Sequence, residues 1–459
     1  MKTDTIVAIA TAMAGSGIGI VRISGEEAVS ITDQIFHMPG GKKLSDMETH
    51  TIHYGHIRDG EEVIDEVMVL LMRGPRSYTR EDTVEIDCHG GVYVMKRILE
   101  TVIKYGARPA EPGEFTKRAF LNGRIDLSQA ESVIDVISAK NEFALKSSMK
   151  QLSGAVSDAV KEIRGEILHE IAFIESALDD PEHISLDGYG ERLELTIEGA
   201  VDRIEKLLAS SDNGRILKEG ISTVIVGKPN AGKSSLLNTL LGEERAIVTE
   251  IAGTTRDVLE EQINLNGIIL NIIDTAGIRD TDDIVEKIGV DKARKYVKDA
   301  DLILYVVDAS TNLDENDGEI MELLHGRRTI VLLNKSDLTP LTTAEDIRVH
   351  VDKDCPVISI SAREQKGIDV FTEQIRKMFF RGEVTFNDEV YITNIRHKTA
   401  LQEALSSLHL VEQSIADGMP EDFYSIDLMN AYEVLGTIIG EAVEDDLVNE
   451  IFSKFCMGK

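Results

Sequence analysis

The sequence is poor in cysteine, proline and aromatic residues, and it contains no tryptophan. Its three cysteines, Cys88, Cys355 and Cys456, lie far apart without CxxC spacing, so they indicate neither a disulfide framework nor a zinc site. No apolar run approaches the roughly 20 residues that a membrane-spanning helix needs. The short apolar run Ile6–Ala14 follows Asp4, which spoils the positive flank of a secretory signal. We therefore expect a reduced, cytoplasmic protein with no membrane span.

Positive charge is also scarce, because 49 Lys and Arg face 81 Asp and Glu, giving a net charge of −32. Such a chain repels phosphate backbones, so a nucleic-acid substrate must bind either at a local positive site or through another subunit. Acidic residues concentrate in 126–210 and 382–459, whereas residues 1–125 are close to neutral. That near-neutral segment holds a local basic group, which is either a nucleic-acid-binding site or ordinary solvated surface charge: Arg108, Lys117, Arg118 and Arg124.

The chain, at 459 residues, is too long for one core and favours about three domains. Residues 1–125 mix strand-like runs and turns with a helical pattern at Val92–Tyr105, which is typical of an α+β domain. The expected strands there are Ile18–Ser24, Glu66–Leu71 and Thr83–Asp87.

Two acidic segments, 126–210 and 382–459, carry helical patterns. In the first, apolar residues recur at spacings of three and four and lie on one helix face: Val160, Ile163, Ile167, Ile171 and Ile174. The stretch Asp179–Gly190 breaks this segment into at least two helices. In the second, Ala400–Ile415 and Tyr424–Phe455 are expected to be helical.

Between the helical segments, apolar strands alternate with amphipathic helices, which predicts a mostly parallel, doubly wound sheet. The expected strands are Ser222–Gly227, Gln262–Asn266, Ile268–Asp274, Leu302–Asp308, Thr329–Asn334 and Val357–Ser361. The flanking segments suggest one helical domain interrupted by this α/β domain. The predicted boundaries are 1–120 for the N-terminal domain, 121–212 for the first helical part, 213–381 for the inserted domain and 382–459 for the second helical part.

A phosphate-binding pattern lies at residues 227–234, which read Gly-Lys-Pro-Asn-Ala-Gly-Lys-Ser and match G-x-x-x-x-G-K-[ST]. A strand precedes it and a helix follows, which is the context that this motif requires. Its glycines let backbone N–H groups curl around a β-phosphate, and the helix N-terminus adds positive potential. Lys233 would span the β- and γ-phosphates, and Ser234 would bind Mg²⁺.

Three further motifs follow in the order of a Ras-like GTPase. Asp274-Thr-Ala-Gly277 ends a strand, where a carboxylate can reach the Mg²⁺ shell. In Asn334-Lys-Ser-Asp337 the last carboxylate can accept hydrogen bonds from guanine N1–H and N2–H₂, a pattern that adenine does not offer. Ser361-Ala362 is the usual backbone support for guanine O6. We therefore predict a GTP-binding hydrolase.

The residue that follows Asp274-Thr-Ala-Gly277 differs from that of the simplest GTPases. Many relatives have a Gln there that orients the attacking water, and this chain has Ile278. Residues 249–257 form the candidate first switch, with Thr255 as the Mg²⁺ and γ-phosphate sensor. Asn230, inside the phosphate loop, is either a plain turn residue or a ligand for a monovalent cation in place of an arginine finger.

Across its whole length the chain resembles the MnmE (TrmE) family of tRNA-modification GTPases. The most specific markers are Ile18-Gly-Ile-Val-Arg-Ile-Ser-Gly25, Cys88-His-Gly-Gly91, the run 107–123, Pro229-Asn-Ala-Gly-Lys-Ser-Ser235, Ile251-Ala-Gly-Thr-Thr-Arg-Asp257 and the terminal Phe455-Cys-Met-Gly-Lys459. One departure is the loop Thr11–Ser16, which lacks the proline-rich character usual in relatives.

The resemblance implies an N-terminal domain that binds tetrahydrofolate and forms a homodimer, and a helical domain with the GTPase domain inserted. It also implies an FAD-containing MnmG-type partner, in a heterotetramer or larger complex that engages the tRNA. The pair would add an aminomethyl or carboxymethylaminomethyl group to C5 of the wobble uridine U34, with methylene-tetrahydrofolate as the one-carbon donor. The folate site would accept the 5-formyl or methylene derivative.

The family's site residues map onto this chain by position. Its folate contacts fall on Arg22, Glu85, Arg124 and Lys459, where a carboxylate suits the pterin N–H edge and cations suit the glutamate tail. Cys456 is a candidate for the modification chemistry. The Mg²⁺ ligands map to Ser234 and Thr255, and the water-positioning carboxylate maps to Glu286, which with Lys233 makes the catalytic pair. The K⁺ ligands map to Asn230, Thr249, Ile251 and Thr254, so that K⁺-dependent dimerisation of the GTPase domains would drive the cycle.

Together, motifs and resemblance predict one set of GTP-binding residues. They are Asn230, Ala231, Gly232, Lys233, Ser234, Ser235, Thr249, Glu250, Ile251, Ala252, Gly253, Thr254, Thr255, Asp274, Thr275, Ala276, Gly277, Asn334, Lys335, Asp337, Ser361 and Ala362.

Two other functions compete with this interpretation. A ribosome-assembly GTPase would share the phosphate loop and switch pattern, but such chains typically add a basic RNA-binding module. A folate-dependent one-carbon enzyme with a merely regulatory GTPase domain is the second alternative.

Overall fold

The computed structural model describes residues 4–243, 261–265, 267–273, 300–380, 392–441, 445–455 and 458. The chain divides into two compact units, which are described separately below. The first comprises Met1–Ser138, Ser148–Ile204 and Thr399–Lys459. The second comprises Ala139–Ser147 and Glu205–Lys398.

The first unit begins with a seven-stranded sheet in the order β3-β4-β5-β6-β2-β1-β7, antiparallel except for the pair β1–β7. The strands are β1 (Ile6–Ile9), β2 (Gly19–Ser24), β3 (Phe36–His37), β4 (Thr51–Asp59), β5 (Glu62–Met72), β6 (Thr83–Cys88) and β7 (Arg108–Pro109). Between them lie α1 (Ala28–Ile35), the 3-10 helix η1 (Leu44–Asp46) and α2 (Val92–Lys104).

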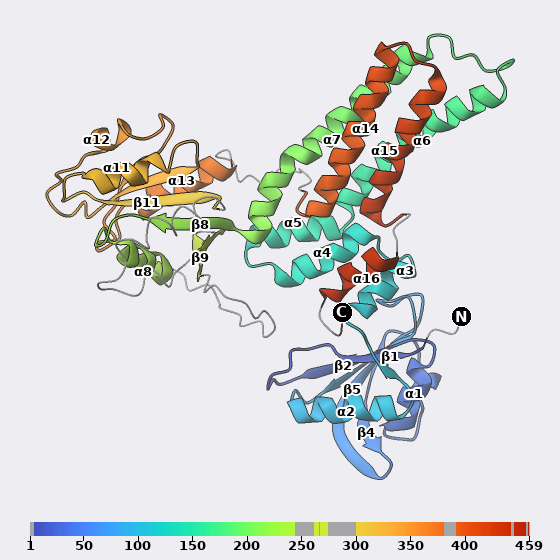
Figure 1. The fold of residues 1–459 in the computed structure, drawn as a ribbon. Helices are drawn as coiled ribbons and strands as arrows, with labels where there is room; N and C mark the ends of the chain where they lie inside the picture. Colours follow the sequence, from blue (N-terminus) through green and yellow to red (C-terminus); the bar gives the residue numbers. More distant parts are fainter. Residues whose placement is uncertain are drawn as a thin grey trace. The chain divides into compact units, whose positions relative to one another are not determined.

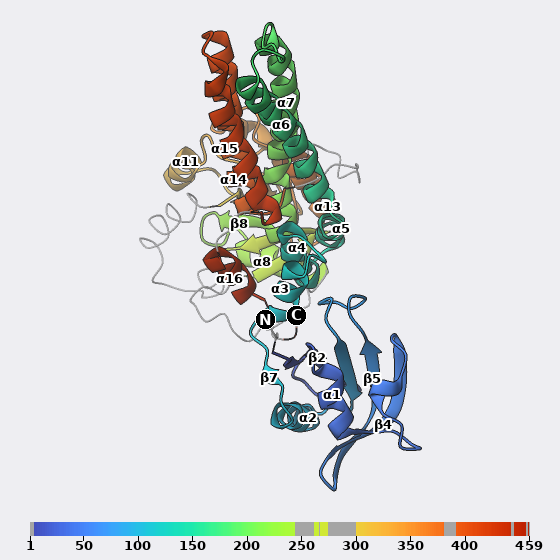
Figure 2. The ribbon, with the colours of Figure 1, turned by 90° about the vertical axis from the view of Figure 1, so that its right-hand side faces the viewer.

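One face of this sheet is apolar and is covered by α1 and α2 (Figure 2). Alternate strand residues such as Val21, Ile23, Val84 and Ile86 are fully buried there, because successive side chains in a strand point to opposite faces. The opposite face carries the polar residues Arg22 and Glu85 and is examined below as a site. The three predicted strands and the predicted helix are confirmed with small shifts at their ends.

A helical bundle follows, and its long helices lie side by side in Figure 1; it belongs to the first unit except for residues 139–147, 205–219 and 395–398, which belong to the second. The helices of this part of the chain are α3 (Glu114–Leu121), α4 (Leu127–Ser138), α5 (Glu142–Leu152), α6 (Ala155–Asp179), α7 (Tyr189–Glu219), α14 (Ile395–Ala416), α15 (Glu421–Ile439) and α16 (Asp445–Ser453). The predicted apolar stripe of α6 is buried throughout, and the break predicted at Asp179–Gly190 is confirmed. No described helix is both long enough and apolar enough to cross a bilayer.

The segment Tyr424–Phe455, predicted to be helical, contains the end of one helix, α15, and a second helix, α16. Gly440 adopts the left-handed backbone conformation, with φ of +88°, and ends α15. A side chain at this position would also clash with Phe120, since an added Cβ would lie 2.7 Å from its ring. Glycine therefore serves both the helix end and the packing against α3.

The second unit contains a six-stranded sheet in the order β13-β12-β11-β8-β10-β9, in which only β9 and β10 pair antiparallel among the described strands. Its strands are β8 (Ile221–Val226), β9 (Glu261–Leu265), β10 (Ile268–Ile272), β11 (Leu302–Asp308), β12 (Thr329–Asn334) and β13 (Val357–Ser359). Its described helices include α8 (Lys233–Glu243), α11 (Glu315–Glu322), α12 (Ala344–Arg348) and α13 (Ile368–Phe380).

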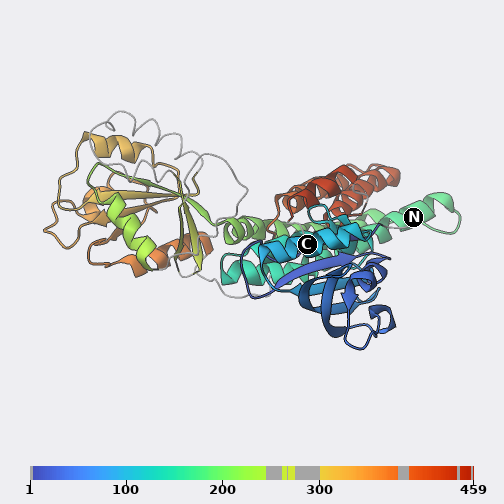
Figure 3. The same ribbon diagram turned by 90° about the horizontal axis from the view of Figure 1, so that it is seen from below.

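Helices cover both faces of this sheet, as Figure 3 shows. One buried cluster joins the strands to α8 and α13, and a second joins the opposite strand faces to α11 and α12. The predicted doubly wound, mostly parallel sheet is confirmed, and so is the combination of an α+β domain, a helical domain and an α/β domain. Because parallel strands end at the same edge, the loops after β8, β11, β12 and β13 are placed to share one site.

Candidate functional site

The loop between β8 and α8 depends on two glycines with positive φ. Gly227 has a φ of +152°, and an added Cβ would lie 2.3 Å from the carbonyl oxygen of Val306. Gly232 has a φ of +97°, and its Cβ would lie 2.1 Å from Nδ2 of Asn334. The loop thus packs directly on β11 and on the end of β12, where no other residue type fits. Its last glycine leads into the first turn of α8, whose free N–H groups favour an anion.

Lys233 is the first residue of α8 and is held by the loop itself. Its Nζ donates to the carbonyl oxygens of Gly227 and Lys228, at 2.7 and 2.8 Å. A lysine ammonium has three N–H donors, so one remains for a phosphate oxygen. Burial lowers the pKa of Lys233 from its ordinary value, and an anion beside it would favour the charged form of the ammonium.

Asn334 ties three parts of the site together from a buried position at the end of β12. Its Nδ2 donates to the carbonyl oxygen of Ala231 at 3.0 Å, and its Oδ1 accepts from the backbone N–H of Ala362 at 3.1 Å. On the other side, the hydroxyl of Thr239 in α8 donates to the carbonyl oxygen of Ala362 at 2.8 Å. The asparagine therefore fixes the phosphate loop against the loop after β13.

Asp337 presents an exposed carboxylate at the same edge of the sheet. The hydroxyl of Ser361 donates to its Oδ1 at 2.7 Å, and this hydrogen bond lowers the pKa of Asp337. The backbone N–H of Ser336 donates to the carbonyl oxygen of Ile360 at 3.0 Å, which joins the two loops. An ionised, accepting carboxylate held in this way suits a ligand edge that carries two N–H donors.

Lys335, between these residues, has the uncommon positive φ of 63°. Its Nζ lies 2.5 Å from Oδ2 of Asp308, at the end of β11. Asp308 also accepts from the backbone N–H and the hydroxyl of Ser310, at 2.9 and 2.6 Å. Burial opposes the charge of Asp308, but Lys335 and Ser310 outweigh it and lower the pKa of this carboxyl. Asp308 was missed as a site residue, although it ends a predicted strand at the correct edge.

Several predicted residues lie outside the part of the chain that the structure describes. They are Thr249, Glu250, Ile251, Ala252, Gly253, Thr254, Thr255, Asp274, Thr275, Ala276, Gly277, Ile278, Glu286, Cys456 and Lys459. Of the predicted cation ligands, Asn230 and Ser234 are described. Asn230 is exposed in the loop and has a φ of 63°, so it serves the turn whether or not it also binds a cation. Among the described residues, no three or more His, Cys, Asp or Glu gather as a metal site.

In the first unit, Arg22 and Glu85 stand directly opposite each other on β2 and β6. The Nε of Arg22 donates to Oε1 of Glu85 at 2.6 Å, and both side chains are about 15% exposed, at 14% and 16%. The Nη1 of Arg22 also donates to the carbonyl oxygen of Gly458, at 3.0 Å. The structure thus brings two predicted folate residues together with the residue that precedes Lys459 in the chain.

Tyr78 connects this pair to the third predicted folate residue. The Cζ atoms of Arg22 and Arg124 lie 5.8 and 4.8 Å from the centre of its ring, within the range of cation–π contacts. Its hydroxyl lies 2.9 Å from that of Thr116 in α3. Sequence reasoning missed Tyr78, because an aromatic residue in a loop between strands carries no signal of its own.

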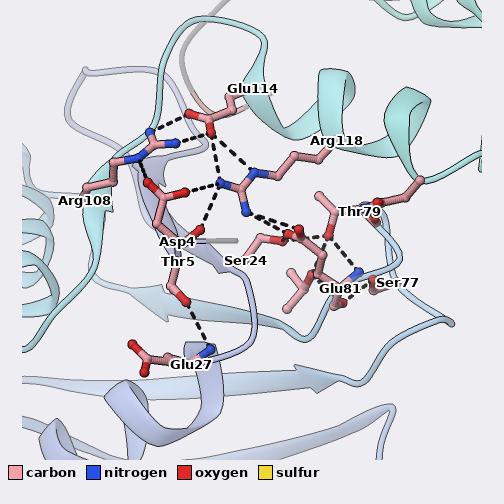
Figure 4. Close-up of polar contacts among 12 residues, drawn as sticks. Asp4, Thr5, Ser24, Glu27, Ser77, Thr79, Glu81, Arg108, Glu114 and Arg118 are labelled. Atoms are coloured by element: carbon pink, nitrogen blue, oxygen red, sulfur yellow. Dashed lines mark hydrogen bonds and ion pairs between the residues drawn. The ribbon is translucent and has the colours of Figure 1, made fainter. Parts of the chain in front are cut away.

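A buried ion network holds the loop that carries Tyr78, as Figure 4 shows. Arg118, which is 8% exposed, pairs with Glu81 at 3.0 Å and with Glu114 at 3.0 Å. Glu81 in turn accepts from the hydroxyl of Ser24 at 2.8 Å. Arg118 therefore links α3 and β2 to the loop that carries Tyr78, and so helps to hold this loop against the sheet.

The basic group predicted from the sequence is corrected by the same network. Arg108 pairs with Asp4 and with Glu114, Lys117 donates to Asn449, and Arg118 is buried among carboxylates (Figure 4). Carboxylates within the unit neutralise Arg108 and Arg118, so these two residues do not contribute to a basic surface for nucleic acid, whereas Lys117 keeps its charge because the amide oxygen of Asn449 is neutral. Arg124, beside Tyr78, is the member of the group that remains at the candidate site.

Asp87 lies two residues beyond Glu85 on the same strand, so both carboxylates are on the same face of the sheet. Its Oδ1 is buried and has no hydrogen-bond partner among the described residues. Burial, with a smaller contribution from Glu85, raises the pKa of Asp87. A buried acceptor without a partner is costly, and a ligand with N–H donors would satisfy it. The face therefore fits a heterocycle that carries N–H groups and an anionic tail.

Known proteins match both parts of this description. The model of the GTP-binding protein TrmE N-terminus matches residues 5–124, and the model of the MnmE helical domain matches residues 127–456. The tRNA modification GTPase MnmE of Lachnoclostridium phytofermentans is 61% identical over 460 residues and covers 100% of both chains. Proteins of the same name from Clostridioides difficile and Bacillus subtilis are 50% and 47% identical and cover 99% of this chain. The match over the full length favours tRNA modification over a ribosome-assembly role, and the chain belongs to the MnmE (TrmE) family of tRNA modification GTPases.

Proposed function

We propose that this GTP hydrolase acts in the cytoplasm with an FAD-containing MnmG-type partner to modify C5 of the wobble uridine U34 of certain tRNAs. Methylene-tetrahydrofolate would supply the one-carbon unit, and the product would carry an aminomethyl or carboxymethylaminomethyl group. The observation that carries this proposal is the group formed by Arg22, Glu85 and Asp87 on one face of the N-terminal sheet, with Tyr78 and Arg124 beside it.

For the nucleotide, the proposed roles follow from the contacts of the described residues. Asp337 would accept from guanine N1–H and N2–H₂, supported by Ser361, while the backbone of Ala362 would support O6. Lys335 would lie along the base, held by Asp308. Lys233 and the N–H groups of the loop would bind the phosphates. Asn334 would hold the residues that bind the phosphates and those that bind the base in fixed relative positions.

For the metal ions, we propose Ser234 and Thr255 as Mg²⁺ ligands and Asn230 with backbone groups of Thr249, Ile251 and Thr254 as the K⁺ site. K⁺ would add positive charge where an arginine finger acts in other GTPases. Glu286 would position the attacking water. Many GTPases use a glutamine for this role, but this chain has Ile278 at that position. We propose further that hydrolysis requires two copies of the chain, each facing the other through its GTPase domain.

For the folate, the chemistry of the donor set supports the proposal. Glu85 and Asp87 are carboxylates for the N–H groups of the pterin, and burial of the unpartnered Oδ1 of Asp87 favours such a partner. Arg22, Arg124 and Lys459 would bind the carboxylates of the glutamate tail. When bound, the folate would supply the one-carbon unit. The chain itself would hold and orient the folate, and Cys456 remains a candidate for the modification chemistry.

Charge supports a partner for the tRNA. The net charge is −32, and Arg108 and Arg118 are occupied by carboxylates within the unit. We propose that the tRNA binds mainly through the complex with the flavoprotein, and that the chain alone, as a homodimer, binds it weakly at physiological salt.

A reconstitution tests this function. The full chain, the flavoprotein, tRNA, GTP, methylene-tetrahydrofolate and an amine donor (ammonium for the aminomethyl product, glycine for the carboxymethylaminomethyl product) are combined, and modified wobble uridine is measured by mass spectrometry of the digested tRNA. The proposal expects product only when all six are present. Formation of the same product without the folate would refute the one-carbon role, and formation without the flavoprotein would refute the role of the partner.

A further inference from the structure

We propose that Lys228, the second residue of the phosphate loop, is a positioning residue that anchors this loop to the N-terminus of α11 and thereby slows the release of bound guanine nucleotide. The motif that defines phosphate loops leaves this position open, so the motif itself assigns no role to the residue. The inference concerns the GTPase activity and does not depend on the proposed folate or tRNA chemistry.

The ion pairs of Lys228 are the first observation. Its Nζ lies 2.6 Å from Oδ2 of Asp317 and 2.9 Å from Oδ2 of Asp314. The Lys228 side chain is 17% exposed and that of Asp317 only 2%, so water screens this pair weakly. Burial opposes the charge of Lys228, but its hydrogen bonds to Asp317 and Asp314 outweigh burial and raise its pKa. The ammonium is therefore charged at neutral pH.

The two carboxylates that pair with Lys228, those of Asp314 and Asp317, are themselves held in place. Asp317 also accepts at Oδ1 from the hydroxyl of Tyr305, at 2.8 Å, and Tyr305 is fully buried in β11. Asp314 and Asp317 form a capping box at the start of α11, in which each carboxylate accepts from the backbone N–H of the other residue. Both oxygens of Asp317 are thus occupied, and its position is fixed by the sheet and by the helix end.

The backbone of Lys228 contacts Lys233, the lysine proposed to bind the phosphates. The carbonyl oxygen of Lys228 accepts from Nζ of Lys233 at 2.8 Å. Its neighbour Gly227 packs so closely on Val306 that an added Cβ would lie 2.3 Å from the carbonyl oxygen. The side chain of Lys228 is therefore held by α11, while its backbone orients the group that binds the phosphates. Releasing the side chain frees the first turn of the loop, which must be ordered again whenever a nucleotide binds.

The test measures the release of a fluorescent GDP analogue from the full chain by stopped flow. Lys228→Met removes the charge and keeps most of the aliphatic stem, and Asp317→Asn removes the partner charge. Lys228→Arg keeps the charge, and Lys353→Met is the matched control, because that exposed lysine lies on the same unit away from the loop. Thermal unfolding without nucleotide is recorded for each variant.

Loss of a buried charged hydrogen bond predicts release about tenfold or more faster for Lys228→Met and for Asp317→Asn. The double variant, which leaves no buried charge without a partner, should release nucleotide as fast as the single variants and should still fold. Lys228→Arg should stay within about threefold of the wild type, and Lys353→Met should match it. Unchanged release from a Lys228→Met or double variant that unfolds at a lower temperature would overturn the proposal, because the pair would then serve stability alone.

Discussion

In the second unit, the proposed nucleotide site is built largely from strand ends and backbone groups, whereas the proposed site on the N-terminal sheet is built from side chains of distant segments. Residues 227–234 form the phosphate half as one continuous stretch, and Asn334 joins it to the base half through two hydrogen bonds. On the sheet, Arg22, Tyr78, Glu85, Arg124 and Gly458 come together from separate parts of the chain.

This difference decides what each site tolerates. The nucleotide loop depends on glycines at positions where a Cβ would clash, so its shape is a property of the backbone. The N-terminal site depends on one ion pair, two cation–π contacts and a buried network behind Tyr78. We therefore expect substitutions of single side chains to separate the two activities, and the following predictions run from the largest effect to the smallest.

The largest effect is expected at the base half of the nucleotide site. Asp337→Asn should weaken GTP binding roughly a thousandfold, because it replaces a carboxylate that accepts two charge-assisted hydrogen bonds. It should improve binding of xanthosine triphosphate, whose edge offers an acceptor to the new amide. Isothermal titration with both nucleotides checks this, with the exposed Asp354→Asn as control. Unchanged GTP affinity would mean that Asp337 does not contact the base.

The next effect concerns the cation. Replacing K⁺ by Na⁺ should slow GTP hydrolysis on the order of a hundredfold, somewhat less than the loss of an arginine finger, because Na⁺ is smaller and fits the oxygen ligands poorly. Asn230→Ala should abolish the difference between the two salts. Steady-state phosphate release in matched KCl and NaCl is the measurement, with light scattering to follow association. Equal wild-type rates in the two salts would remove the cation from the mechanism.

A third prediction addresses the N-terminal sheet. Glu85→Gln should weaken binding of 5-formyl-tetrahydrofolate by roughly 10- to 100-fold, because the amide lacks the charge that Arg22 and the pterin N–H groups need. The exposed Glu61→Gln is a matched control on the adjoining turn. Equilibrium dialysis with the labelled folate gives the constants. Equal affinities for the two variants would contradict the assignment of Glu85.

The smallest effect is expected at Tyr78. Tyr78→Leu should weaken folate binding about fivefold, since it removes the ring between the two guanidinium groups, whose contacts are each modest. Tyr78→Phe keeps the ring, loses the hydroxyl that contacts Thr116, and should bind almost as well as the wild type. If the phenylalanine variant were as weak as the leucine variant, the hydroxyl and not the ring would carry the effect.

The sequence predicted the strand ends and the turn that carry the described residues of the proposed nucleotide site, because the motifs there are short, contiguous and attached to strands with long apolar runs. Asp308 ended one such strand and was still overlooked, since no motif names it. The N-terminal site was predicted only through the resemblance to a family, and Tyr78 was missed because the packing that places it involves residues far apart in the chain.

The strand β4 was also missed, and the reason is its pattern. The polar and apolar residues alternate over Thr51–Tyr54, but Ile52 and Tyr54 are exposed, and the alternation breaks at Ile57, which is buried on the same face as Thr51 and His53. The group of Arg108 and Arg118 was misread for a related reason. Charge counted along the chain does not reveal which carboxylates fold back onto a cation, and here Glu81 and Glu114 do so.

The most direct test of the account measures two activities in one variant. In the reconstituted complex, Glu85→Gln is assayed for GTP turnover and for modified wobble uridine at a folate concentration near the wild-type dissociation constant. The account predicts GTP turnover within about twofold of the wild type, with the amount of modified uridine reduced by roughly 5- to 50-fold. Modification at the wild-type rate would contradict the claim that this sheet supplies the folate for a separate GTP-driven reaction.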